Sequence, residues 1–256
     1  MTYALALLRR WVVDYFNAHD ADAARDFIAP DYALRIGDVV FAGRDDQWLP
    51  AVDVQMRAYP GLGMTVHQTL TGAGWAAAWF SEHGETEGRG AAWSGVGIYR
   101  AAGGVLTGCV AQEDYMTRRR QLKSGVADPV EPPALAPWDT RPEPRDRAAE
   151  AIVLAWLGQG WPCTPDAVRC DDEHITNTAL DFEVSTTEVG ELLSSGVHVA
   201  FNVRQRGIYR GGLPEAAPRR ETLDCNGIVR VEDGRVVSGR VIRDRMGLWS
   251  RLKAAA

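Results

Sequence analysis

The end of this chain repeats a stretch from its own middle. Residues 97–123 and 227–253 align without a gap and share eight of twenty-seven residues, where average composition would give about two. The identical positions are Gly97/Gly227, Ile98/Ile228, Arg100/Arg230, Gly104/Gly234, Asp114/Asp244, Met116/Met246, Leu122/Leu252 and Lys123/Lys253. Because such self-similarity marks repeated folding units, the sequence predicts two copies of one domain.

A proline-rich break separates the two copies. Six of the thirteen prolines fall within residues 123–146. Proline fixes φ and removes a hydrogen-bond donor, so this segment is predicted to be a semi-rigid extended linker. We expect a first domain over 1–124, a linker over 125–144 and a second domain over 145–256, and the length of 256 residues suits two domains.

Charge and composition exclude several function classes. The net charge is −6, which disfavours a nucleic-acid-binding surface. Arg9 and Arg10 interrupt the short apolar stretch at the beginning of the chain, which therefore predicts neither a signal peptide nor a membrane span, and we expect a cytoplasmic protein. The dominance of arginine over lysine indicates a bacterial source with GC-rich codons.

The four cysteines lack metal-ligand spacing, and we expect no metal site. Reduced, buried thiols are the main expectation for a cytoplasmic protein, with a disulfide between Cys163 and Cys170 as the alternative.

The hydrophobic pattern of the first domain begins with helical spacing and then changes to alternation. A helix is expected over 3–19, with one apolar face made of Leu5, Leu8, Val12, Tyr15, Phe16 and His19. A short helix over 20–29, capped by Asp20 or Asp22, a strand over 31–41 and a helix over 44–58 follow. Four strands are then expected over 64–70, 75–86, 91–100 and 105–116.

The second domain repeats this order with a loss. A helix is expected over 146–158, and strands over 179–189, 197–210, 221–231 and 235–246. Too few residues follow Cys170 for a copy of the third helix, so the counterpart of residues 42–60 is expected to be missing or greatly shortened.

Several motifs carry a family resemblance by their order and spacing. They are FIAPDY at 27–32, AYPGL at 58–62, SEHG at 81–84, and GVLTG at 104–108 followed by Asp114. Together they resemble the SnoaL-like polyketide cyclases of the nuclear-transport-factor-2-like superfamily. The family's "AFPDL" turn has an aspartate where this chain has Gly61. The resemblance covers the first domain and, more weakly, the second.

The resemblance implies an α+β fold of two tandem cone-shaped domains. Each would be a curved mixed or antiparallel sheet wrapped around a long N-terminal helix, with a pocket inside the cone. It also implies that Asp114 is a general acid or base acting on a carbonyl substrate without a cofactor.

Acid–base chemistry beside a carbonyl needs a base with a raised pKa and a donor to the developing oxyanion. Asp114 is the expected base, and His83 and Tyr32 are the expected donors. The expected substrate-binding residues are Tyr15, Tyr59, Trp79, Trp93 and Gln112.

Strand alternation places Val110, Gln112 and Asp114 on one face of the last strand, and Ala111 and Glu113 on the other. The sequence interpretation gives Asp114 and Gln112 to the pocket, and turns Glu113 toward solvent or the other domain.

The second copy of the aspartate has different neighbours. Asp244 lies between Arg243 and Arg245 and shares its strand face with Arg240. Because a carboxylate among arginines is held ionised and paired, Asp244 is expected to be a poor base and the second domain a degenerate copy.

The sequence thus predicts an acid–base enzyme acting on a small apolar carbonyl or hydroxyl compound, aromatic or polyketide-like. Aldol-type cyclisation, isomerisation, dehydration and retro-aldol cleavage remain open. The alternative is a non-catalytic ligand-binding or assembly protein of the same fold. A closed apolar cavity with Asp114 at its floor would favour the enzyme, and a pocket filled by tryptophan side chains would favour the alternative.

The two sheets are expected to pack on each other as an internal pseudo-dimer. Each sheet can bury only one face against its own helix, and apolar residues such as Val96, Ile98, Ile228 and Val241 need cover. Since the linker raises the effective concentration of one domain near the other, pairing within the chain should win over pairing between chains. A homodimer would then use a different surface.

Overall fold

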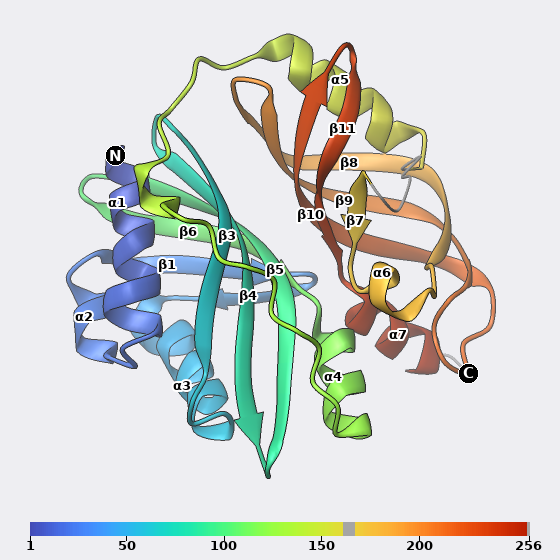
Figure 1. The fold of residues 1–256 in the computed structure, drawn as a ribbon, viewed down its shortest axis with the longest axis horizontal. Helices are drawn as coiled ribbons and strands as arrows, with labels where there is room; N and C mark the ends of the chain where they lie inside the picture. The colour runs from blue at the N-terminus through green and yellow to red at the C-terminus, as the bar shows by residue number, and fades with distance from the viewer. Residues whose placement is uncertain (161–166, 255–256) are drawn as a thin grey trace.

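The computed structural model describes residues 1–160 and 167–254. Figure 1 shows a curved sheet in each half of the chain, with helices at its side. None of the helices within these residues has the length and the apolar run needed to cross a membrane.

The elements of the first half are α1 (Tyr3–Arg10), the π-helix η1 (Trp11–Phe16), α2 (Ala21–Arg25), β1 (Ile28–Ile36), β2 (Val39–Ala42), the π-helix η2 (Arg44–Trp48), α3 (Leu49–Ala58), β3 (Gly63–Gly72), β4 (Trp75–Thr86), β5 (Arg89–Ala102), β6 (Val105–Glu113) and α4 (Tyr115–Ser124).

The second half begins after a single 3-10 turn in the linker, η3 (Pro137–Asp139). Its elements are α5 (Arg147–Gly158), β7 (Val168–Cys170), α6 (Glu173–Thr176), β8 (Asp181–Ser195), β9 (His198–Gly211), β10 (Arg219–Glu232), β11 (Arg235–Arg243) and α7 (Arg245–Ala254).

The two sheets have corresponding topologies. The first has the order β2-β1-β6-β5-β4-β3 and the second has the order β7-β11-β10-β9-β8. β1 runs parallel to β6, and β7 runs parallel to β11, whereas the other neighbours are antiparallel. The fold is therefore α+β, with two tandem cones, as the sequence predicted.

The repeat seen in the sequence is a repeat of structure. The bounds of β10, β11 and α7 each lie 130 residues after the bounds of β5, β6 and α4. Gly97 and Gly227 are repeated because each lies beside an aromatic ring: a Cβ at Gly97 would come within 2.8 Å of the Tyr99 ring, and one at Gly227 within 2.4 Å of the Phe201 ring.

Some elements differ from expectation. The strand expected over 31–41 is a hairpin of β1 and β2, which turns at Gly37 with φ +56°. The final strand of each half ends three residues earlier than expected, and the helices α4 and α7 were not predicted. In the second half, the described chain between β7 and β8 holds only the four-residue α6, which agrees with the expected loss of the third helix.

The first core forms between the N-terminal helix and the concave face of the first sheet. Leu5, Leu8, Val12, Tyr15 and Phe16 are all buried there. His19 is exposed because the helix ends before it. The helix widens to a π-helix at Trp11, which changes the direction of the side chains that follow, Tyr15 among them.

The proline-rich linker is docked along the edge of the first sheet. Its Ala134 N–H donates to the carbonyl oxygen of Val66 at 2.9 Å. The ring of His67 contacts the Pro132 carbonyl oxygen at 2.9 Å, and the Thr69 hydroxyl donates to the Pro137 carbonyl at 2.5 Å. The linker therefore forms part of the surface between the two halves.

The two sheets pack face to face through a separate apolar cluster. It joins β3, β4 and β5 of the first sheet to β9, β10 and β11 of the second, and contains Leu70, Trp75, Ala77, Val96, Ile98, Ala200, Ile228 and Ile242. Three of the four residues predicted for this face are present. The prediction for Val241 is wrong, because Val241 lies in the core of the second half. Strand alternation points the next residue, Ile242, to the junction instead.

Polar groups inside the junction are paired across it. The Asn226 side-chain amide donates to the carbonyl oxygens of Val96 at 3.0 Å and Val110 at 2.9 Å. Because buried donors must be satisfied, these contacts fix the relative position of the two sheets.

One buried arginine connects three carboxylates at the lower end of the junction. Arg245, at the start of α7, lies 2.6 and 2.7 Å from the two carboxylate oxygens of Asp114. It also contacts Asp172 at 2.7 Å and Asp171 at 3.3 Å. Burial alone lowers the pKa of Arg245, but the attraction of the three carboxylates raises it above the usual value. Arg245 therefore stays charged and holds the two halves together.

Replacing this arginine should destabilise the whole chain. Arg245→Met removes the shared cation and leaves buried carboxylates without their partner, which costs about 3–5 kcal/mol of unfolding free energy. Urea denaturation measures the effect. Arg206→Met is a matched control, because Arg206 forms only an exposed 4.0 Å pair with Glu188 and should change the free energy of unfolding little. Equal unfolding midpoints for the two variants would contradict a stabilising role of the Arg245 network.

Candidate functional site

The residues at the end of β6 point to its two opposite faces, one toward the second sheet and one into the first cone. In the register of β5 and β6, Gln112 pairs with Val96, a residue of the junction cluster. Gln112 and Asp114 therefore face the second sheet. Ala111 lies in the core of the first cone, and Glu113 follows on the same face.

Asp114 has a structural role in this position. It caps α4, accepting from the Thr117 N–H at 3.1 Å and the Thr117 hydroxyl at 2.6 Å, in addition to its contacts with Arg245. Burial raises the pKa of Asp114, and the Arg245 guanidinium opposes this. Both carboxylate oxygens are occupied by donors. The role of Asp114 as a general base stays a prediction.

Asp244 differs from its expected state. Its flanking arginines go elsewhere: Arg243 contacts Asp171, and Arg245 contacts Asp114. Asp244 instead caps α7, accepting from the Gly247 N–H at 2.8 Å, and burial raises its pKa. The expectation of an arginine-paired Asp244 is therefore wrong. The repeated aspartate is explained by the helix that begins after it in each copy.

The other expected residues are distributed over different parts of the first half. Tyr32 and Tyr15 are buried in the core, each with its ring centroid 5.1 Å from that of Trp48. His83 contacts the Thr65 hydroxyl at 3.1 Å, and burial lowers its pKa. Trp79 packs against the junction cluster. The structure does not gather these residues around Asp114.

The structure instead brings two glutamates together inside the first cone. Glu82 on β4 and Glu113 at the end of β6 share a hydrogen bond. The Gln55 side chain donates to Glu82 at 2.9 Å, and the Trp93 indole donates to Glu113 at 3.0 Å. Glu113 was expected to face solvent or the other domain. That is corrected here, because the second sheet covers the opposite face of β6.

This pair cannot be fully ionised. Burial raises the pKa of Glu82 well above its usual value, and repulsion by Glu113 raises it further. Burial also raises the pKa of Glu113, although the Trp93 indole and the Arg118 guanidinium oppose the shift. Burial therefore favours the protonated form of Glu82, and the donors at Glu113 favour the anionic form of that carboxyl.

The pair lies beside an aromatic opening. The Arg118 guanidinium stacks over three rings, 4.3 Å from Tyr115, 5.0 Å from Trp93 and 5.4 Å from Tyr59. Tyr59, Tyr115 and Arg118 also line a surface hollow of about 450 Å³. Glu82 is buried, whereas Glu113 is partly exposed, so solvent reaches the pair from the Glu113 side.

The centre of the cone is filled by aromatic rings. Trp11 packs against Tyr15, Trp48 and Tyr99, with centroids 5.6–6.5 Å apart. A small molecule would therefore reach the carboxyl pair at the mouth of the cone, between Tyr59 and Arg118, rather than in its centre.

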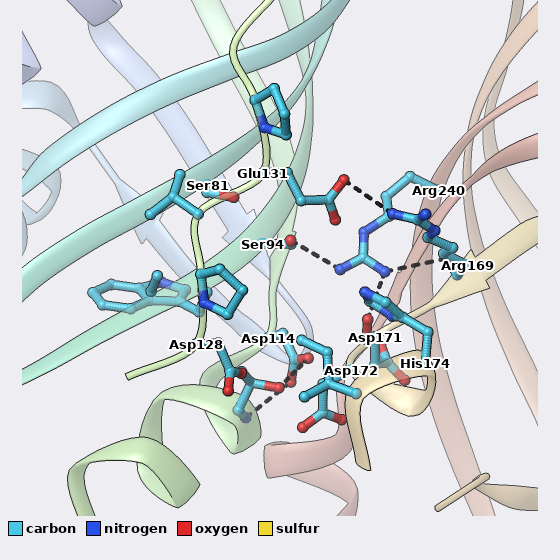
Figure 2. A pocket seen from close by; sticks show the side chains of 17 residues that line it. Ser81, Ser94, Asp114, Asp128, Glu131, Arg169, Asp171, Asp172, His174 and Arg240 are labelled. Atoms are coloured by element: carbon cyan, nitrogen blue, oxygen red, sulfur yellow. Dashed lines mark hydrogen bonds and ion pairs between the residues drawn. The ribbon is translucent and has the colours of Figure 1, made fainter. Parts of the chain in front are cut away.

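A second cavity lies between the two halves. Figure 2 shows it bounded by Ser81, Ser94 and Asp114 on one side and by Asp171 and Arg240 on the other. Its volume is about 300 Å³, and linker residues 128–132 form one wall.

Within the described residues, no group of three His, Cys, Asp or Glu side chains is arranged to hold a metal ion. Cys109 and Cys225 are buried free thiols. Cys163 lies outside the described residues, and so does the disulfide considered for it.

The glutamate pair was missed because the sequence interpretation turned Glu113 away from the cone. One signal could have identified it. Val96 and Ile98 were already assigned to the covered face of the sheet, and small residues such as Ala111 next to Glu113 are typical of a face packed closely on a helix.

Residues 8–108 match the family model described as the SnoaL-like domain. Among solved structures, the chain is similar to IdmH from Streptomyces antibioticus, with 19% identity and a TM-score of 0.42 over 46% of this chain and 96% of IdmH. It is similar to a SnoaL-like protein from Jannaschia sp. CCS1, with 13% identity and a TM-score of 0.45 over 48% and 92% of the two chains. An LEH-like epoxide hydrolase of M. tuberculosis matches with 12% identity and a TM-score of 0.41 over 48% and 91%.

A search of the curated proteins found no match. The helix, the six-stranded sheet and the family match agree with the sequence motifs of the first half. Residues 8–108 of this chain are therefore similar to the SnoaL-like domain.

Proposed function

We propose that the first cone is a cofactor-independent acid–base enzyme that uses Glu82 and Glu113 on a small apolar carbonyl or hydroxyl compound. The observation that carries the proposal is the hydrogen-bonded carboxyl pair with raised pKa values beside an aromatic opening. A carboxyl pair that shares one proton supplies a base and an acid at the same place.

The two carboxyls have different roles in this proposal. Glu113 is the base, because the Trp93 indole stabilises its anionic form and because it is the partly exposed member. It removes a proton from the carbon next to the substrate carbonyl. Glu82 keeps its proton at neutral pH and returns it to the substrate oxygen or carbon.

Arg118 stabilises the negative charge that develops on the oxygen. Its guanidinium lies over the rings of Tyr115, Trp93 and Tyr59, at the boundary between the hollow and the carboxyl pair. A fixed cation near the developing enolate lowers the barrier because no solvent has to reorganise. The aromatic walls favour a substrate with an apolar, aromatic or polyketide-like body.

Proton transfer next to a carbonyl is common to aldol-type cyclisation, isomerisation, dehydration and retro-aldol cleavage. IdmH is itself described as a proposed polyketide cyclase, which supports the first of these reactions.

In this proposal the second half is a packing partner that covers the outer face of the first sheet, and the chain works as an internal pseudo-dimer. The buried thiols of Cys109 and Cys225 suit the reducing cytoplasm.

The filled centre of the cone favours a second candidate, a non-catalytic ligand-binding or assembly protein. Trp11 and Trp48 occupy space that a substrate would need in an open cone. The two candidates differ in whether the chain moves protons on carbon, which can be measured without knowing the natural substrate.

Exchange of carbon-bound hydrogen for deuterium tests the acid–base proposal. In D₂O, the wild-type chain should catalyse exchange next to the carbonyl of aromatic ketones such as acetophenone and 2-tetralone, followed by NMR. Glu113→Gln keeps the shape but removes the base, so exchange should slow by roughly 10²–10⁴-fold.

Asp114→Asn is the matched control, because it changes the neighbouring carboxyl on the opposite face of the sheet. The proposal expects exchange within a few-fold of the wild type for this variant. A loss only in Asp114→Asn would assign the base to Asp114, and no catalysed exchange across the ketone panel would favour the non-catalytic candidate.

The raised pKa of Glu82 predicts a pH-dependent stability. The folded chain keeps a proton that the unfolded chain releases near pH 4.5, so the contribution of Glu82 is fully present below that pH. It is lost as the pH rises toward the pKa of the folded state. Relative to Glu82→Gln, the wild-type free energy of unfolding should fall by up to about 1.4 kcal/mol per pH unit in this window.

Urea denaturation of the two proteins, at intervals between about pH 4 and pH 8, measures this difference. Glu188→Gln serves as the control, because Glu188 is 73% exposed and its removal should not change the pH dependence. Parallel stability curves for the wild type and Glu82→Gln would show that Glu82 has an ordinary pKa.

A further inference from the structure

Arg240 is a buried cation with only neutral hydrogen-bond partners. It is 3% exposed and belongs to β11 of the second sheet. Its Nη1 atom donates to the carbonyl oxygen of Asp171 at 2.5 Å, and its Nη2 atom donates to the Ser94 hydroxyl oxygen at 2.9 Å. Its Nε atom has no hydrogen-bond partner among residues 1–160 and 167–254. A buried charge of this kind is costly unless an anion compensates it.

The carboxylates near Arg240 are committed to other arginines. Asp114 and Asp172 contact Arg245, and Asp171 contacts Arg243. The remaining acidic groups of the cavity wall are similarly engaged, Glu131 with Arg169 at 3.4 Å and Asp128 with Arg120. Among the residues that the structure describes, Arg240 forms no ion pair. Glu131, Asp171 and Asp114 attract its charge from a greater distance, but burial still lowers the pKa of Arg240 below its usual value.

Arg240 lines the cavity at the junction of the two halves. Figure 2 shows its guanidinium between Ser94 of the first sheet and Asp171, which directly follows β7. The cavity measures about 300 Å³, a size that suits a small molecule. Its other walls are largely apolar, with Ala92, Val130 and Ile175 among them.

His174 adds a second polar group without a partner to this wall. Its Nδ1 atom is buried and makes no hydrogen bond. Burial lowers the pKa of His174, and the charges of Arg240 and Arg169 lower it further, so the imidazole is neutral near pH 7 and can donate or accept.

We infer that the junction cavity binds a small organic carboxylate with an apolar body. The Nε atom of Arg240 and the hydroxyl of Ser94 hold the carboxylate group, and the apolar body lies against Val130 and Ile175. The Nε–H of Arg240 donates to one carboxylate oxygen and the Ser94 hydroxyl donates to the other, and the charge of the guanidinium strengthens the first of these hydrogen bonds.

The cavity is formed by the linker together with both halves of the chain. Residues 128–132 close one wall of the cavity. They are tied to the first half at both ends, by the Asp128 N–H to Gln121 at 2.7 Å and by the Pro132 carbonyl to His67 at 2.9 Å. A ligand in the cavity would contact both sheets and the linker, and would therefore stabilise their association.

The site is separate from the Glu82–Glu113 pair, which lies on the opposite face of the first sheet. Binding at the junction can be tested without any measurement of turnover, so its failure would leave the proposed acid–base chemistry untouched.

Isothermal titration of the full chain with benzoate tests this inference, and benzamide is the neutral control of the same shape. Benzoate should bind with a stoichiometry of one and benzamide at least roughly tenfold more weakly, because only the carboxylate compensates the Arg240 charge. Arg240→Met should abolish the preference for benzoate, whereas Arg206→Met, which replaces an exposed arginine, should keep it.

Ser94→Ala provides a second variant if Arg240→Met does not fold. It should weaken benzoate binding several-fold, because one donor to the carboxylate is lost. Three results would overturn the inference: equal affinities of the wild type for benzoate and benzamide, unchanged benzoate affinity in a folded Arg240→Met, or unchanged affinity in Ser94→Ala.

Discussion

Successive side chains of a strand point to opposite faces. Because the second sheet covers one face of β6, this alternation fixes the surroundings of each acidic side chain at the end of that strand. The junction cluster around Val96 and Ile98 turns Gln112 and Asp114 toward the second half. Glu113, one residue away, is thereby turned into the cone, where it meets Glu82. The packing of the two sheets therefore determines which carboxyl lies inside the cone and which one joins the two halves.

Two neighbouring acidic residues consequently have opposite environments. Asp114 is surrounded by donors, from Thr117 and from Arg245 of the other half. Such a carboxylate is satisfied and serves stability. Glu113 shares a hydrogen bond with a second buried carboxyl, and burial raises the pKa of both groups. A retained proton beside an anionic carboxylate is what acid–base catalysis requires.

The sequence was sufficient for the fold because its signals are local. The ungapped repeat, the alternation of the strands and the proline-rich break predicted two tandem copies of one domain, and the family resemblance added the cone shape. The sheet faces at Val96, Ile98 and Ile228 were assigned correctly. The site was harder to predict because its partners are distant in sequence. The contact of Asp114 with Arg245 spans 131 residues, and the pairing of Glu82 with Glu113 depends on the strand register. The repeat of Asp114 and Asp244 has a structural explanation as well, because both side chains cap the helix that follows, α4 or α7, and aspartate is a favoured N-cap residue.

The central claim is that Glu82 and Glu113 share one proton at neutral pH. Carbon-13 NMR of the chain labelled at the glutamate δ-carbon tests it most directly, because the carboxyl shift reports protonation at each site. We expect one glutamate signal to keep the shift of a protonated carboxyl at pH 7, and to disappear in Glu82→Gln. A spectrum in which every glutamate is ionised at pH 7 and titrates near its ordinary pKa of about 4.3 would contradict the account.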